Sequence, residues 1–181
     1  MQTQVKKQNM IQNLACSAVC LALCMLLPFL TGQIPQIGSM LCPMHIPVLL
    51  AGFLCGPWWA MAVGLVAPVL RFVLFGMPPL LPVGLAMTFE LAAYGLTAGI
   101  LYRVLPEKPS CVYGSLIGAM LAGRLVWGVA SIFVYGALGN TFTWAVFVAG
   151  AFVNAIPGMI LHIVVVPAIV FGLKKTALFG R

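Results

Sequence analysis

Long apolar stretches alternate with short polar breaks along the chain. The most informative stretch is 83–103, which is mostly apolar but contains Glu90 and ends in Arg103. About 20 such residues span a bilayer as a helix. A charged side chain at membrane depth costs several kcal/mol, about 3 by insertion scales, so Glu90 indicates a buried partner or a function.

Five other stretches show the same apolar pattern, at 11–31, 45–56, 58–75, 112–137 and 142–173. The stretch at 45–56 is too short for an upright span, and we interpret it as one half of a tight helical pair with 58–75. Proline and glycine mark the breaks between the stretches. The sequence therefore predicts an all-α integral membrane protein, a six-transmembrane-helix bundle that occupies 1–181 as a single domain.

The composition supports this class and the charges give an orientation. Hydrophobic residues make up 63% of the chain and charged residues only 6%, against about 25% charged in soluble domains. Seven of the nine basic residues lie at three segment ends, namely Lys6, Lys7, Arg103, Lys108, Lys174, Lys175 and Arg181. This is the positive-inside pattern. We therefore expect a prokaryotic cell membrane protein with both termini cytoplasmic, and no nucleic-acid partner despite the net charge of +7.

Two arginines lie inside apolar stretches and compete for Glu90. One carboxylate cannot neutralise both Arg71 and Arg124, so pairing with one leaves the other in need of an anion. The pair could be purely structural, or Glu90 could contact a ligand. Arg71, about one turn from a loop, could meet a ligand or snorkel to the headgroups. Arg124 is deeper and needs a buried partner.

Further polar and aromatic residues are candidates for a binding pocket. The candidate substrate-binding residues are Glu90, Arg71, Arg124, His45, Asn154, Tyr94, Trp127 and Gln33. Each has a structural alternative. His45 could be a hydrogen-bonded core histidine, Asn154 could satisfy backbone freed by Pro157, and Trp and Tyr are common at membrane interfaces. We expect the loop 32–44 and the turn 76–82 to close the pocket.

No catalytic or cofactor-binding pattern is present in the sequence. The six cysteines form no C-x-x-C pair or metal-ligand spacing, and no triad, carboxylate pair or Walker motif occurs. We therefore expect no enzyme activity, no metal or other cofactor on this chain, and an energy source in a partner. Cys16, Cys20 and Cys24 recur every four residues and predict a packing seam. The pairs Gly52/Gly56, Gly95/Gly99 and Gly114/Gly118 predict close helix contacts within the bundle.

Specific runs along the chain resemble a known transporter family. They are LCPMHIPVLLAGFLCGPWWAMAVGLVAPVLR at 41–71, FGMPPLLP at 75–82, FELAAYG at 89–95 and GAFVNAIPGMI at 150–160, with Ala18-x-x-x-Ala22 in the first helix. These resemble the substrate-binding S components of energy-coupling factor (ECF) transporters. The resemblance implies a pocket near the outer face, a membrane T component and two cytoplasmic ATPases that use ATP. It also implies that Ala18 and Ala22 face the T component.

The preferred interpretation is a high-affinity binding subunit for ATP-driven uptake of a small water-soluble vitamin or precursor. The resemblance does not name the substrate, because S components bind unlike vitamins through unrelated pocket residues. The excess of basic residues in the membrane favours a ligand with a carboxylate or phosphate-like group. One alternative is a self-sufficient proton-coupled carrier that uses Glu90, and another is a membrane enzyme that uses His45 or His162.

Overall fold

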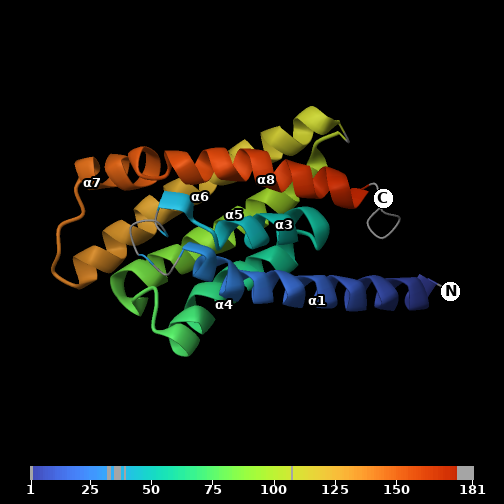
Figure 1. The fold of residues 1–181 in the computed structure, drawn as a ribbon, viewed down its shortest axis with the longest axis horizontal. Helices are drawn as coiled ribbons and strands as arrows, with labels where there is room; N and C mark the ends of the chain where they lie inside the picture. Colours follow the sequence, from blue (N-terminus) through green and yellow to red (C-terminus); the bar gives the residue numbers. More distant parts are fainter. Residues whose placement is uncertain (1, 32–33, 35–37, 39, 107, 175–181) are drawn as a thin grey trace.

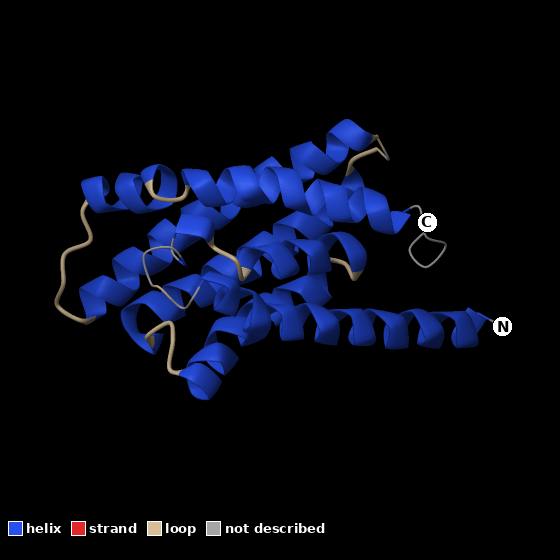
Figure 2. Cartoon of the chain, in the orientation of Figure 1, coloured by secondary structure: helices blue, strands red, loops and turns tan. Residues whose placement is uncertain are grey.

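The structure, a computed structural model, describes residues 2–31, 34, 38, 40–106 and 108–174. Within these residues the chain is helical and contains no strand (Figure 2). Five helical segments are long and apolar enough to cross a membrane, namely Met10–Leu30, Pro57–Phe75, Leu80–Val104, Pro109–Ala137 and Trp144–Leu173. The prediction of an all-α membrane protein is confirmed.

The helices follow the predicted stretches with shifted ends. They are α1 (Gln2–Leu26), α3 (His45–Leu54), α4 (Pro57–Phe75), α5 (Leu85–Val104), α6 (Pro109–Ala137), α7 (Trp144–Val148) and α8 (Ile156–Lys174). A tighter 3-10 turn, Leu27–Thr31, replaces the last turn of the first predicted span and contains Pro28, which lacks the N–H that an α-helix interior needs. Helix α6 begins three residues earlier than predicted, because Pro109 suits the first turn of a helix.

Glycines and prolines set the other helix ends. Gly56 has a φ of 98°, which side-chain-bearing residues rarely adopt, and it allows the sharp turn from α3 into Pro57 at the start of α4. Gly76, with a φ of 71°, ends α4 in the left-handed conformation that is common at helix C-termini. The backbone at Leu81 is extended, with φ −117° and ψ 135°, so α5 begins only after it.

The helices run up and down, so their connections gather at two ends. The α4–α5 and α6–α7 connections lie at one end, on the left of Figure 1, which we call the loop end. The start of α1, the α5–α6 connection and the end of α8 lie at the other, which we call the terminal end.

Helix α5 is the centre of the bundle and packs against α3, α4 and α6. Glycines let it approach α4 closely. A Cβ on Gly64 would lie 2.5 Å from the Leu91 backbone, and one on Gly95 would lie 2.6 Å from the backbone oxygen of Ala60. The predicted packing role of the Gly95/Gly99 pair is thus confirmed. The Gly114/Gly118 pair differs, since a Cβ on Gly114 would meet nothing within 4 Å.

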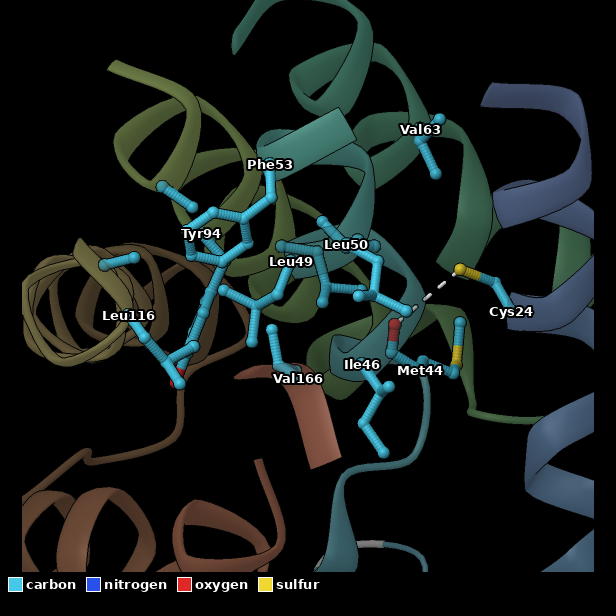
Figure 3. Packing of buried hydrophobic residues seen from close by; sticks show 14 of the residues in the cluster. Cys24, Met44, Ile46, Leu49, Leu50, Phe53, Val63, Tyr94, Leu116 and Val166 are labelled. Atoms are coloured by element: carbon cyan, nitrogen blue, oxygen red, sulfur yellow. Dashed lines mark hydrogen bonds between the residues drawn. The ribbon is translucent and has the colours of Figure 1, made fainter. Parts of the chain in front are cut away.

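Helix α3 is short and almost wholly enclosed, because every residue from His45 to Phe53 is buried. Leu49, Leu50 and Phe53 pack with Tyr94 of α5 and residues of α6 and α8 in one apolar core (Figure 3). Ten residues span only about 15 Å, so α3 by itself is too short to cross a bilayer core of about 30 Å. The predicted cysteine seam is confirmed, since Cys24 of α1 is buried in this core and Cys20 is buried in a second cluster with Ala51 and Ala60.

The last predicted span is interrupted. A wide turn, Ala149–Val153, follows α7, and the chain turns again at Asn154 before α8 starts at Ile156. Pro157 consequently falls in the first turn of α8. Backbone N–H groups there have no intrahelical acceptor, so proline loses no hydrogen bond at this position. Asn154 is exposed, so its position places it at a turn rather than in the interior of a long helix.

Candidate functional site

A cavity of about 630 Å³ lies toward the loop end of the bundle. Such a volume is typical of small-molecule sites. Its walls are largely apolar, with contributions from prolines and methionines, while its charged lining residues are Arg71, Glu90 and Arg124. The segment 42–45, which leads into α3, forms part of the lining. The enclosed start of α3 therefore places His45 in the cavity rather than at a membrane surface.

The deepest charged contact joins α5 and α6. Nη1 of Arg124 lies 2.9 Å from Oε1 of Glu90, and both side chains are buried. The N–H bonds do not point at this oxygen, so the contact is an ion pair and not an aligned hydrogen bond. Nε2 of His45 lies 3.4 Å from the same oxygen. We call these three residues, His45, Glu90 and Arg124, the polar floor.

A second set of groups packs beneath the polar floor. The imidazole of His162 on α8 stacks on that of His45 with centroids 5.8 Å apart, and Tyr94 meets His45 edge-on at 4.9 Å. Nε2 of His162 is 3.2 Å from the carbonyl oxygen of Cys42. These contacts tie α3, α5 and α8 together directly under the cavity.

The polar floor is incompletely hydrogen-bonded. Within the described part of the chain, neither ring nitrogen of His45 has a hydrogen-bond partner, nor does Nε of Arg124. Buried polar groups are nearly always hydrogen-bonded to protein, water or ligand, because leaving one unpaired costs about 1–3 kcal/mol. Since both residues line the cavity, a polar molecule bound there could supply the missing bonds.

Arg71 forms a separate charged position. Its Nη1 donates a hydrogen bond of 2.7 Å to the carbonyl oxygen of Met25, at the end of α1. Its guanidinium lies 5.3 Å from the ring centroids of both Phe29 and Phe75. The side chain is only 3% exposed, so burial within the bundle favours a pocket position of Arg71 over snorkelling to the headgroups.

The helix register gives the height of Arg71 above the polar floor. Gly64 of α4 lies against Leu91 of α5, and Ala60 lies against Gly95, so the two helices are antiparallel. Glu90 is therefore level with position 65, and Arg71 is six residues nearer the loop end. At 1.5 Å per residue, this separation is about 9 Å.

Comparison with protein families identifies the chain. A family model described as "ECF transporter, substrate-specific component" matches residues 12–170. The chain belongs to this family of S components. Comparisons with curated proteins and with solved structures found no match.

The cavity of this S component brings together most of the predicted binding residues. Those that line it are His45, Arg71, Glu90, Arg124, Trp127 and Asn154. Tyr94 is not among the lining residues, because it is fully buried beneath His45. Gln33 lies outside the described residues. The binding roles of all these residues stay predictions.

The candidate Trp127 lies in a group of aromatic side chains beside the cavity of the S component. Trp127 stacks on Phe147 with centroids 6.2 Å apart and meets Phe142 edge-on at 5.7 Å. Trp144 packs against the other side of this group and is 75% exposed. Of the tryptophans and tyrosines, Trp127 is therefore the one whose position allows contact with a ligand.

Several lining residues of the S component were not predicted from the sequence. They include Cys42 and the methionines Met44, Met77 and Met87. Cys42 has a φ of 47°, a conformation that favours glycine, and burial raises the pKa of its thiol to about 11. A loop segment has no periodicity, so no sequence signal showed that Cys42 turns inward. Methionines in an apolar sequence likewise cannot be told from core residues.

Proposed function

We propose that this S component binds a small water-soluble vitamin or vitamin precursor in the cavity above the polar floor. The cavity carries the proposal, because its apolar walls and few buried polar groups suit a tightly held small molecule. Family membership supports the same function. Glu90, Arg71 and Arg124 then set the polarity of the site, and His45, Trp127 and Asn154 add contacts from three other elements.

The proposed topology has six membrane segments, with both termini in the cytoplasm of a prokaryotic cell. Five segments are long enough to cross the bilayer, and the enclosed α3 is the sixth. The basic residues support this orientation, since Arg103 and Lys108 flank the α5–α6 connection at the terminal end. The cavity then opens toward the outside, where a nutrient arrives.

We propose that transport uses partners that hydrolyse ATP, since the chain belongs to the S-component family and has no Walker motif of its own. We propose that α1 docks on a T component that is coupled to two cytoplasmic ATPases. Ala18 and Ala22 are exposed on α1, whereas Cys20 and Cys24 are buried inside the bundle. A surface of small exposed residues lets another helix approach closely.

Reconstitution in liposomes tests the proposed function. We expect uptake of the bound compound only when the T component and ATPases are present with ATP. The double variant Ala18→Leu/Ala22→Leu should lose uptake but keep ligand affinity, because the bulk is added far from the cavity. Ala168→Leu, at an exposed position on α8, is the matched control and should keep both.

Uptake by the chain alone, driven by a pH gradient, would contradict this function and favour the proton-coupled carrier. The ion pair argues against that carrier, because Glu90 is engaged by Arg124 and His45 instead of standing alone. Equal uptake by the α1 double variant and the wild type would remove the docking role of Ala18 and Ala22.

A further inference from the structure

We propose that the compound bound by this S component is a monocarboxylate whose acid group is held by Arg71. Its other end carries an uncharged polar group that lies deeper, on the polar floor. This inference rests on the proposed function and specifies the ligand class of the same cavity. It assigns different tasks to the two buried arginines.

Arg71 has no acidic partner among the described residues. The sequence contains only two acidic residues, Glu90 and Glu107. Glu90 is in contact with Arg124. Glu107 lies outside the described residues, and Arg71 lies near the loop-end terminus of α4. A buried guanidinium without a counter-charge is costly, and an anionic ligand would supply that charge.

The surroundings of Arg71 hold its guanidinium ready for an anion. The Met25 carbonyl takes one of its five N–H donors. The rings of Phe29 and Phe75, which meet edge-on with centroids 5.0 Å apart, both flank it. Among the described residues, Met25 offers the guanidinium its one hydrogen-bond acceptor. Since Arg71 lines the cavity, donors remain for a planar carboxylate, which arginine binds in bidentate geometry.

A single negative charge fits the cavity best. Its charged lining residues are Arg71, Glu90 and Arg124, which sum to one positive charge. A carboxylate balances that charge, whereas a phosphate monoester carries about −1.5 to −2 and would leave an uncompensated negative charge. A cationic ligand would add to the excess.

The polar floor favours an uncharged group. Arg124 and Glu90 already neutralise each other, so a charged group there would leave one charge unpaired in a buried site. His45 and Nε of Arg124 lack hydrogen-bond partners among the described residues. An amide, ureido, hydroxyl or heterocyclic group could satisfy them without adding charge.

Titration of an acid and its methyl ester tests the inference. The wild-type chain is purified from cells grown in rich medium, and the compound it releases on denaturation is identified by mass spectrometry. Calorimetry then measures binding of the released acid and of its methyl ester to the ligand-free protein. Biotin, pantothenate and nicotinate, each beside its methyl ester, serve as defined probes if nothing is released.

We expect esterification to weaken binding to the wild type by at least ~30-fold, since breaking a buried charge pair costs about 2–5 kcal/mol. The Arg71→Gln variant should bind the acid more weakly than the wild type by a similar factor. Its affinity for the ester should equal that of the wild type. Ester binding also reports that the variant is folded. Arg71→Lys should give an intermediate acid affinity, and Lys108→Gln, an exposed control, should behave as wild type.

Two results would overturn the inference while the proposed function stands. One is a released compound that is neutral, cationic or a phosphate ester. The other is an acid-to-ester ratio that is the same in Arg71→Gln and in the wild type. If nothing is released and no acid or ester probe binds, the proposed function itself fails.

Discussion

The ion pair at the base of the cavity makes a quantitative prediction. Replacing Glu90 with Gln removes one partner and leaves the charge of Arg124 buried, since the two side chains are 3% and 7% exposed. At their separation of 2.9 Å, the attraction is about 6 kcal/mol for an effective dielectric constant near 20. Desolvation offsets part of this, so we expect Glu90→Gln to lower the free energy of unfolding by about 3–5 kcal/mol.

The double variant separates the interaction energy between Glu90 and Arg124 from the effect of removing each charge alone. In Glu90→Gln/Arg124→Gln neither charge remains, so the loss should be smaller than the sum of the two single losses by about 2–3 kcal/mol. Equilibrium unfolding in mixed micelles, followed by circular dichroism as the denaturing detergent is increased, gives all four free energies. Lys108→Gln, in an exposed connection, should change stability by no more than about 0.5 kcal/mol.

The reasoning is refuted if Glu90→Gln is no more destabilising than Lys108→Gln, or if the single losses simply add. Either result would mean that the two charges are solvated separately. The polar floor would then be open to water, and the charge balance that assigns an anion to Arg71 would no longer hold.

Three further predictions follow from the packing and the cavity. Gly64→Ala should lower the unfolding free energy by about 1–3 kcal/mol in the same unfolding assay, because its Cβ would meet the α5 backbone, whereas Gly114→Ala, in open space, should be neutral or stabilising by up to about 1 kcal/mol. Ligand binding should change the fluorescence of Trp127, so Trp127→Phe should remove a signal that Trp58→Phe, at a 68% exposed position, retains. Alkylation of Cys42 by N-ethylmaleimide, followed by peptide mass spectrometry, should be slow at neutral pH and accelerate about tenfold per pH unit below its pKa of about 11, because the thiolate reacts. A rate that does not change between pH 7 and 9 would contradict that pKa.

Much of the fold could be predicted because each membrane-spanning helix is recognisable from its own continuous apolar sequence. Continuous apolar runs identified the spans, and Gly56 and Gly76 mark helix ends because their positive φ angles favour glycine. The interruption near Asn154 was signalled by polar and proline residues, although its geometry was not.

The partner of Glu90 could not be predicted, because it depends on the heights of three helices relative to one another. The glycine contacts set those heights. They place Arg71 about 9 Å above Glu90, and Arg124 reaches the carboxylate from α6. The burial of Tyr94 and the inward turn of Cys42 depend on tertiary packing in the same way, because neither has a distinctive spacing in the sequence.

Native mass spectrometry of the full chain tests the central claim most directly. The protein is purified in mild detergent from cells grown in rich medium, so that its natural ligand is available. The account predicts one small organic molecule bound per chain, which is removed by denaturation and raises the unfolding temperature when added back. A chain that is repeatedly free of ligand, and that no water-soluble vitamin stabilises, would contradict the assignment of the cavity as a substrate site.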